Sequence, residues 1–261
     1  HELVTLISPI RLADEVHLEP GKFGTRIACS NPAVPTDDSN VAHQAAEVFI
    51  RHFLRRRSLS AFGVDIAIEK RIPIGAGLGG GSSDAAAVLY GLNEHYGFPF
   101  HREDLMEMGL EIGADVPFFI FGQPALATGI GERLVPYRDL TPYFVLLLYP
   151  GISVSTAEVY KNLDLGLTNC EKKLKGIVLN QGIFDAAEHL CNDLESVAMR
   201  RCPDIALIKK ELNRLGALGA LMSGSGSSVF GLFTSADEAR NARLRLTAHA
   251  EWQVFQTKVI V

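Results

Sequence analysis

Alternating hydrophobic and polar positions divide the first part of the chain into short strands and an amphipathic helix. Strands are predicted over 1–8, 14–19, 25–29 and 62–68. A helix is predicted to start near Ser39, because apolar side chains recur on one helical face: Val41, Ala45, Val48, Phe49 and Phe53.

The middle of the chain adds two helices, one ending near Gly97 and one over 102–112, and then an apolar strand at 116–120. Residues 137–142 are typical of a linker. The elements predicted after it are strand 143–149, helices 155–163, 183–200 and 203–215, strands 218–222 and 228–233, helix 235–248 and strand 252–261. Helices interleaved with hairpin-like strand pairs predict a layered α+β fold with domains 1–137 and 138–261.

Composition excludes several classes of protein. At 261 residues and 47% hydrophobic content, the chain is long enough for two ordinary domains. Its net charge of -5 gives no electrostatic case for binding nucleic acid or an anionic membrane, and no hydrophobic run reaches the length of a membrane span. Four cysteines without a C-x-x-C pair favour a reducing compartment, so we expect the cytoplasm, or the stroma in a plastid-bearing organism. The eight histidines lack metal-ligand spacing, so no zinc site is expected.

The strongest local signal is the glycine-rich stretch from Pro73 to Ser83, which has five glycines in seven positions. A helix follows it at once, with Ser82 or Ser83 expected as its cap. Free main-chain N–H groups and the positive end of a helix dipole bind anions, above all phosphates. The stretch therefore predicts a cradle for nucleotide phosphates.

Other interpretations of this stretch fit less well. Gly75, Gly77 and Gly80 match the dinucleotide pattern G-x-G-x-x-G, but the region about 20 residues later is typical of a helix end and a turn, not of a strand ending in an acidic residue. The P-loop pattern fails because no lysine follows the last glycine. A turn without a ligand is disfavoured by the conformational entropy that so many glycines lose on folding.

Phosphoryl transfer to an alcohol also needs a carboxylate that orients or deprotonates the hydroxyl. Asp115 is the candidate, because it lies in the otherwise uncharged segment 113–117, where desolvation would perturb its titration. From composition alone, an aspartate that terminates a turn or caps a helix is the stronger interpretation. Ser82 and Ser83 are candidate phosphate or metal contacts as well as candidate caps.

A second glycine-rich turn, Ser223–Ser228, precedes a predicted strand and by itself is typical of an ordinary turn. Because the two glycine-rich turns lie in different halves of the chain, with Asp115 between them in sequence, we expect the active site in a cleft between the two domains.

The glycine stretch with Ser-Ser-Asp-Ala-Ala, the segment Gly-Ala-Asp-Val-Pro-Phe-Phe and the turn at 223–228 resemble the motifs of the GHMP kinases, and the resemblance extends over nearly the whole chain. It implies a two-domain α+β fold with an N-terminal ATP-binding domain and a C-terminal substrate-side domain. It also implies an ATP-dependent kinase of isoprenoid precursor biosynthesis, with Mg²⁺ as cofactor, acting on the hydroxyl of a small molecule that carries a cytidine diphosphate. A monomer or weak homodimer is expected.

The resemblance assigns roles to residues. Asp115 would be the catalytic carboxylate. ATP would be bound by Asn40, Lys70, Pro73, Ile74, Gly75, Ala76, Gly77, Leu78, Gly79, Gly80, Gly81, Ser82 and Ser83. The substrate would be bound by His1, Thr156, Tyr160, Ser223, Gly224 and Gly226. Lys70 could equally be a solvated charge at a strand end, and Tyr160 a core aromatic. Asn192–Glu195 matches a family signature and is expected to be structural.

The chain departs from the family pattern at its start. His1-Glu2-Leu3 resembles the end of an Asp-Gly-Tyr-His segment. The family's preceding Ala-Lys-x-Asn segment, whose lysine lies beside the catalytic aspartate, is not in this sequence. Without that lysine the transferring phosphoryl group loses charge stabilisation, and without that strand a sheet edge is exposed. We therefore expect the 261-residue chain to be poorly active and less stable than a longer form.

Three alternatives stay open. The first is another GHMP kinase, acting on homoserine or mevalonate. The second is a non-catalytic nucleotide-binding relative, which the absent lysine favours. The third and most distant is a dinucleotide-dependent oxidoreductase.

Overall fold

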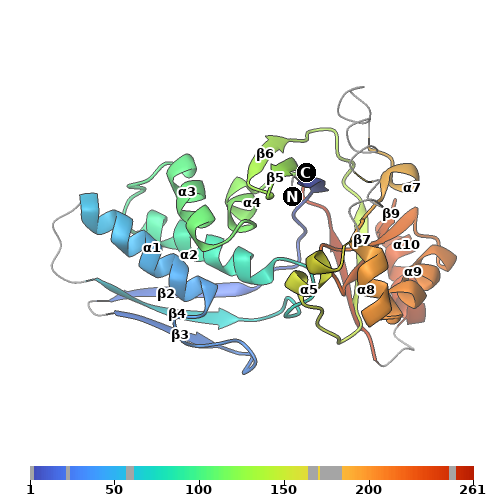
Figure 1. Cartoon of the computed structure of the whole chain (residues 1–261), viewed down its shortest axis with the longest axis horizontal. Coiled ribbons are helices and arrows are strands. Elements are labelled where there is room, and N and C mark those ends of the chain that lie inside the picture. The colour runs from blue at the N-terminus through green and yellow to red at the C-terminus, as the bar shows by residue number, and fades with distance from the viewer. Residues whose placement is uncertain (1–2, 22–23, 57–61, 164–169, 171–183, 247–250) are drawn as a thin grey trace. The chain divides into compact units, whose positions relative to one another are not determined.

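The chain forms two structural units (Figure 1). The computed structural model describes residues 3–21, 24–56, 62–163, 170, 184–246 and 251–261. The first unit contains Ala13–Ile74 and Gly79–Val135, and the second contains Leu3–Leu12, Gly75–Leu78 and Pro136–Val261. The chain leaves the first unit after Val135 and continues in the second unit from Pro136, near the predicted boundary at residue 137. Two segments of the first half belong instead to the second unit, a grouping that a contiguous division of the sequence cannot express.

The first unit is built on a three-stranded sheet in the order β2 (Glu15–Gly21), β4 (Gly63–Glu69), β3 (Gly24–Cys29). β2 pairs with β4 antiparallel and β3 pairs with β4 in parallel. Burial alternates along these strands, as their sequence periodicity predicted.

Helices α1 (Val41–Arg56) and α2 (Gly80–His95) cover one face of this sheet (Figure 1). α3 (Arg102–Ile112) and α4 (Val116–Phe121) pack beside them. The unit also holds the short strand β5 (Ala125–Gly129) and all but the last residue of β6 (Arg133–Pro136). The core contains the fully buried side chains of Phe49, Leu89, Leu92, Leu105 and Met108. α2, which follows the glycine-rich stretch, thus lies at the centre of the first unit.

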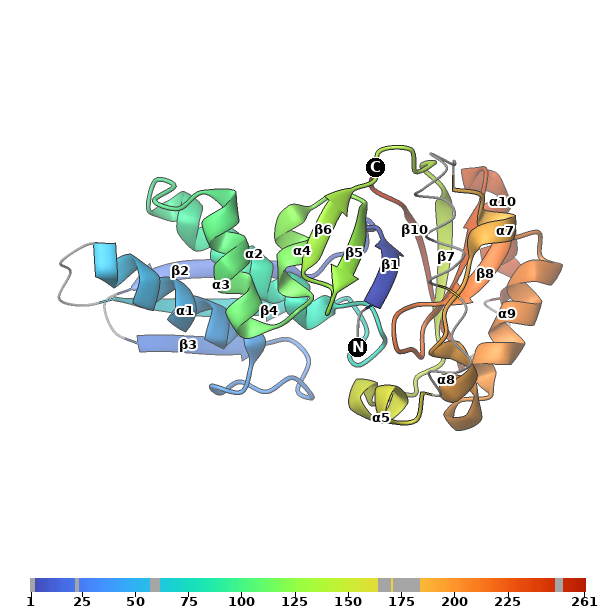
Figure 2. The same ribbon diagram turned by 45° about the horizontal axis from the view of Figure 1, so that its top comes forward.

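The second unit contains a four-stranded antiparallel sheet in the order β10 (Gln253–Lys258), β7 (Phe144–Tyr149), β9 (Val229–Phe233), β8 (Gly219–Met222). Its other elements are β1 (Leu3–Ile7), α5 (Thr156–Lys161), α7 (Ala186–His189), α8 (Glu195–Arg201), α9 (Asp204–Arg214) and α10 (Ala236–Leu246). α9 and α10 lie on one side of the sheet (Figure 2). Leu146 and Leu148 of β7 face that side, whereas Val145 and Leu147 belong to a second apolar cluster. Burial on both faces explains why β7 is continuously hydrophobic.

Two predicted elements and one predicted helix cap were wrong. The apolar run after Asp115 is the helix α4, because Pro117 suits a first helical turn and Gly122, in the left-handed conformation, ends the helix. α2 begins at Gly80, before the serines expected to cap it, and its N-cap is Gly79. The single helix predicted over 183–200 is two helices, α7 and α8, because the chain is extended at Leu190.

Candidate functional site

The first turn of α2 presents a set of open donors. Gly79 is left-handed, with φ of 66°, and the N-cap has no side-chain hydrogen bond. In the described part of the chain, no residue supplies an acceptor for the main-chain N–H groups of Gly80, Gly81 and Ser82, or a partner for the hydroxyls of Ser82 and Ser83. A helix start with unsatisfied N–H groups favours an anion.

Close packing explains the glycines at this helix start. A Cβ added at Gly79 would lie 2.7 Å from Cζ of Phe119, and one at Gly80 would lie 2.9 Å from Cγ2 of Ile72. α4, which carries Phe119, therefore packs against the beginning of α2, with no room for a side chain between them.

Asp115 lies one helical turn before Phe119, so both residues are on the face of α4 that meets Gly79. It occupies the N-cap position of α4, but its side chain makes no capping hydrogen bond. Asp115 is an exposed residue, but neighbouring protein atoms desolvate its carboxylate, and this desolvation raises the pKa of Asp115. The structure thus places an unengaged, desolvated carboxylate in the same unit as the start of α2.

The loop segment Gly75–Leu78 contacts the second glycine-rich turn within the second unit. Oγ of Ser223 donates to the carbonyl oxygen of Gly77 at 2.9 Å. The main-chain N–H of Ser228 donates to the carbonyl oxygen of Ala76 at 3.2 Å. A Cβ added at Gly77 would lie 2.9 Å from the nitrogen of Gly226. The two motifs therefore come together in space as backbone against backbone, which needs glycine on both sides.

α5 supplies the predicted substrate-side residues of this unit. The hydroxyls of Thr156 and Ser225 are 2.7 Å apart, so the start of α5 is joined to the second glycine-rich turn. Tyr160 is 40% exposed, which makes the core interpretation of that residue wrong. Ser223 is partly buried and Gly224 is exposed in the turn itself, whereas Gly226 is buried.

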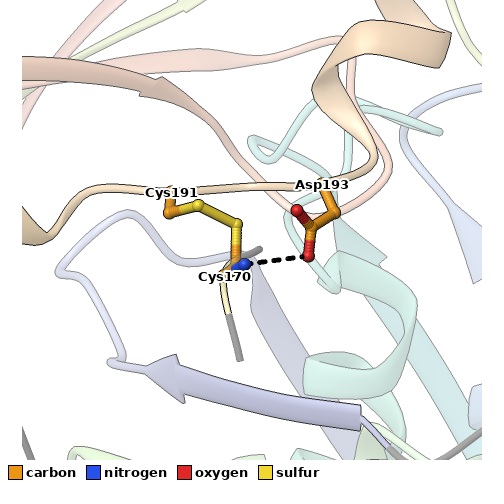
Figure 3. Close-up of side chains that lie close together, drawn as sticks. All are labelled: Cys170, Cys191 and Asp193. Atoms are coloured by element: carbon orange, nitrogen blue, oxygen red, sulfur yellow. Dashed lines mark hydrogen bonds between the residues drawn. A yellow bond between two sulfur atoms is a disulfide. The ribbon is translucent and has the colours of Figure 1, made fainter. Parts of the chain in front are cut away.

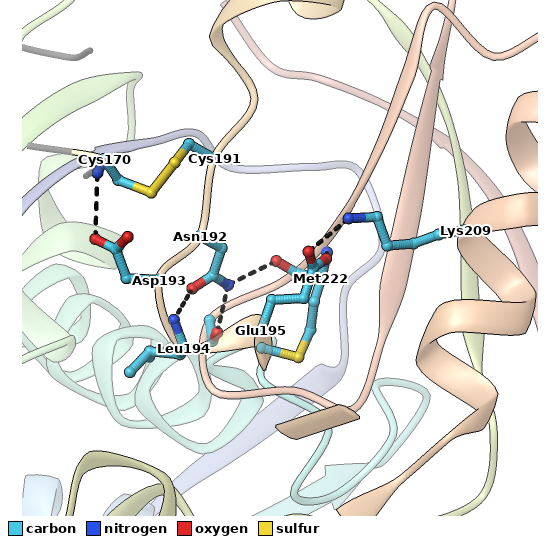
Figure 4. The surroundings of a disulfide bond; sticks show 9 residues. Cys170, Cys191, Asn192, Asp193, Leu194, Glu195, Lys209 and Met222 are labelled. Atoms are coloured by element: carbon cyan, nitrogen blue, oxygen red, sulfur yellow. Dashed lines mark hydrogen bonds and ion pairs between the residues drawn. A yellow bond between two sulfur atoms is a disulfide. The ribbon is translucent and has the colours of Figure 1, made fainter. Parts of the chain in front are cut away.

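The segment Asn192–Glu195 braces the same turn, as its predicted structural role requires (Figure 4). Nδ2 of Asn192 donates to the carbonyl oxygens of Met222, at 2.9 Å, and Gly224, at 2.8 Å. Oε1 of Glu195 accepts from the main-chain N–H of Met222 at 3.0 Å. Sequence reasoning could not identify this bracing, because the segment lies about 30 residues from the turn and the only signal was the family signature.

A disulfide joins Cys170 and Cys191 beside this segment (Figure 3). Asp193 accepts a hydrogen bond from the main-chain N–H of Cys170 at 3.3 Å. The three side chains would have metal-ligand spacing, but the two sulfurs are bonded to each other and no thiolate pair is available to hold an ion. The sparse cysteines, which favoured a reducing compartment, did not predict this disulfide, since separation in the sequence does not reveal proximity in the fold.

The two remaining ATP-side predictions are both engaged within the chain. Asn40 is buried; its Oδ1 accepts from the N–H of Ala42 and its Nδ2 donates to the carbonyl oxygen of Pro35. Lys70 is also buried, in ion pairs with Asp14 and Asp84, so the interpretation as a solvated strand-end charge is wrong. The contacts of these residues with a nucleotide stay predictions, and His1 lies outside the described residues.

Comparison with known proteins identifies the family. The model of the GHMP kinase N-terminal domain matches residues 40–123, and that of the GHMP kinase C-terminal domain matches 178–251. A 4-diphosphocytidyl-2-C-methyl-D-erythritol kinase of Syntrophotalea carbinolica is 44% identical over 100% of this chain and 91% of its own length. One from Geobacter metallireducens is 43% identical with the same coverage.

Solved structures give the same fold. A crystal structure of 4-(cytidine 5'-diphospho)-2C-methyl-D-erythritol kinase has a TM-score of 0.79 at 36% identity, covering 99% of this chain and 90% of that chain. Homoserine kinase from Cytophaga hutchinsonii has a TM-score of 0.80 at 21% identity, with coverage of 99% and 89%, and so shares the fold. Across the described ranges, no helix combines the length and apolarity needed to cross a bilayer. Since the two domain models match more than half of the chain and close relatives cover all of it, the chain belongs to the GHMP kinases.

Proposed function

We propose that this chain transfers the γ-phosphoryl group of ATP to the 2-hydroxyl of 4-diphosphocytidyl-2-C-methyl-D-erythritol. The observation that carries the proposal is the pairing, within one unit, of an open helix start at Gly79–Ser82 with the unengaged carboxylate of Asp115. The names of the relatives that cover the full chain support this choice of substrate.

Each group has a chemical task in such a transfer. The main-chain N–H groups at the start of α2 would bind the phosphates, and the helix dipole would favour their charge. The substrate hydroxyl attacks the γ-phosphorus, the bond to the β–γ bridging oxygen breaks, and ADP leaves. Asp115 would orient the hydroxyl and accept its proton. Because its pKa is raised toward neutrality, Asp115 is a stronger base than an ordinary aspartate.

The residues present fit a magnesium ion. Mg²⁺ prefers oxygen ligands and is commonly held by few protein groups together with phosphate oxygens. The hydroxyls of Ser82 and Ser83 have no partner in the described residues and lie at the helix start where the phosphates would bind. When bound, the ion would neutralise charge on the phosphates. We propose these two serines as its protein ligands.

The test is an assay of phosphorylated product by mass spectrometry with ATP and a panel of alcohols: 4-diphosphocytidyl-2-C-methyl-D-erythritol, homoserine and mevalonate. We expect product from the first alcohol. Asp115→Asn should lower turnover by about 10²–10⁴-fold with ATP affinity retained, because it removes proton transfer but not phosphate binding. Asp65→Asn, in an exposed pair on β4, is the control and should be unchanged. Preference for another alcohol would reject the substrate, and undiminished turnover by Asp115→Asn would reject the mechanism.

A further inference from the structure

A buried cluster of three charged side chains lies next to the phosphate loop in the first unit. Lys70 follows β4, Asp14 precedes β2, and Asp84 lies in the second turn of α2. Nζ of Lys70 donates to Oδ2 of Asp84 at 2.8 Å and also to Oδ2 of Asp14. The three side chains are only 2–6% exposed. Burying charges costs several kcal/mol per ion unless they are paired, so this cluster requires a structural or functional reason.

The cluster fixes the chain on both sides of the glycine loop. On the entry side, Oδ1 of Asp14 accepts from the main-chain N–H groups of Arg71, at 2.5 Å, and Ile72, at 2.8 Å. On the exit side, Asp84 belongs to the helix whose first turn follows the loop. Lys70 is the link between the two aspartates. A Cβ added at Gly80 would lie 3.1 Å from its Nζ, so the ammonium lies directly against the first residue of α2.

The charge states of the cluster are compatible with this linking role. Burial alone would lower the pKa of Lys70, but its hydrogen bonds to Asp14 and Asp84 outweigh that effect and raise the pKa. Burial, partly offset by Lys70 and reinforced by Asp14, raises the pKa of Asp84 to about 7. Lys70 therefore stays protonated and donates to both aspartates.

We propose that Lys70 is a positioning residue, which holds the entry and the exit of the phosphate loop through Asp14 and Asp84 and so prearranges the N–H groups of α2 for the triphosphate. The proposal rests on the proposed function for its ligand. It differs from direct binding of the nucleotide by Lys70, because two donors of the buried ammonium are directed to aspartates.

Substitution of Asp84 distinguishes a positioning role of the cluster from a direct electrostatic effect on phosphate binding. Deleting a negative charge beside a phosphate site should strengthen binding of an anion by Coulomb's law. If Asp84 instead holds the loop through Lys70, its deletion should weaken binding. Asp84→Asn keeps an oxygen that accepts from Lys70, whereas Asp84→Ala and the shorter Asp84→Ser do not reach Nζ.

The experiment measures the affinity of the full chain for a non-hydrolysable ATP analogue by calorimetry, at a temperature where circular dichroism shows each variant folded. We expect Asp84→Ala to weaken binding by about tenfold or more, and Asp84→Asn to stay within about threefold of wild type. The KM of the alcohol should not change. Asp65→Ala, which removes the same charge from an exposed pair in the same unit, should leave affinity unchanged. If Asp84→Ala does not fold, Asp84→Ser replaces it.

Amide hydrogen exchange of the ligand-free protein gives a second readout. The amides of residues 79–83 should exchange faster than in wild type in Asp84→Ala, and at the wild-type rate in Asp65→Ala. Equal affinities for Asp84→Ala and Asp65→Ala, or equal losses for Asp84→Asn and Asp84→Ala, would overturn the positioning role. Failure of the wild-type chain to bind the analogue would overturn the proposed function instead, and exchange would still decide whether the cluster holds the loop.

Discussion

Asp115 occupies a helix-capping position, but its side chain makes no capping hydrogen bond. At the N-cap of α4 an aspartate would ordinarily accept a hydrogen bond from the first turn, but this one makes none. It nevertheless loses hydration, and its pKa rises. A carboxylate that bears a desolvation cost without a structural hydrogen bond is typical of a functional site.

The same desolvation predicts how Asp115→Asn affects stability. Because the pKa of Asp115 is raised in the folded state, the folded chain binds a proton more tightly than the unfolded chain does. Stability is therefore lost as pH rises from the ordinary carboxyl pKa through the raised one. Asp115→Asn lacks this penalty, so its free energy of unfolding should exceed that of wild type at pH 8 by more than at pH 5. Urea titrations at the two pH values measure this, and an equal difference at both would contradict it.

Individual site residues were predictable to different degrees. The dense glycine run is a strong local signal. Asp115 is a weaker one, because composition alone favours a turn or cap aspartate and only the resemblance to the GHMP kinases assigns it a catalytic role, which stays a prediction. The surroundings of Lys70 could not, since its partners Asp14 and Asp84 lie 56 and 14 residues away. From sequence, a charge after a strand is typical of solvent exposure, and only the fold reveals that it is buried.

At the scale of elements, two glycines with similar backbone angles differ in what surrounds them. Gly77 and Gly97 both have positive φ, 73° and 75°, so an alanine at either position is strained by about 1–2 kcal/mol. Only at Gly77 would the added Cβ also meet another segment, the turn at Gly226; at Gly97 nothing lies within 4 Å.

These two glycines make a matched pair of variants. Gly97→Ala should lower the free energy of unfolding by about 1–2 kcal/mol and leave affinity for the ATP analogue unchanged. Gly77→Ala should show the same strain and in addition weaken analogue binding by about tenfold, because the loop must move away from the turn. Urea unfolding and calorimetry measure the two effects. Equal analogue affinities in the two variants would show that the contact between the turns does not shape the phosphate loop.

Periodicity explains which elements the sequence predicted. Elements with one more buried and one more exposed face show a hydrophobic period of 2 residues in a strand or 3.6 in a helix. That periodicity identified β2, β3, β4 and α1. The run Val116–Phe121 is apolar throughout and has no period, and it was taken for a strand although it forms α4. The break between α7 and α8 was missed because it depends on the conformation at Leu190, beside a cysteine whose partner is remote.

At the scale of the whole molecule, each unit has its own hydrophobic core. One cluster, around Phe49 and Leu89, belongs to the first unit. Two others, around Phe233 and Leu147, belong to the second. Independent cores predict that a local perturbation changes the stability of one unit more than that of the other.

The disulfide offers a direct test of that independence. Cys170 and Cys191 are 21 residues apart in the second unit, and a cross-link that closes a loop of this size contributes about 3 kcal/mol in the chain-entropy model. Cys170→Ser should therefore accelerate amide exchange in β7, β9 and α9 while β2 and β4 keep the wild-type rates. Cys29→Ser, which removes a free thiol from the first unit, is the control.

Titration of thiols in the denatured, unreduced wild-type chain checks the premise of that experiment. Two free thiols are expected, from Cys29 and Cys202. Four thiols would show that the cross-link is absent, and loss of exchange protection in β2 and β4 of Cys170→Ser would show that the two cores unfold together. Because Cys191 directly precedes Asn192, which holds the carbonyl oxygens of Met222 and Gly224, loss of the cross-link should also increase exchange in the turn at 223–228. The cross-link thus connects the stability of the second unit to the turn that contacts Gly77.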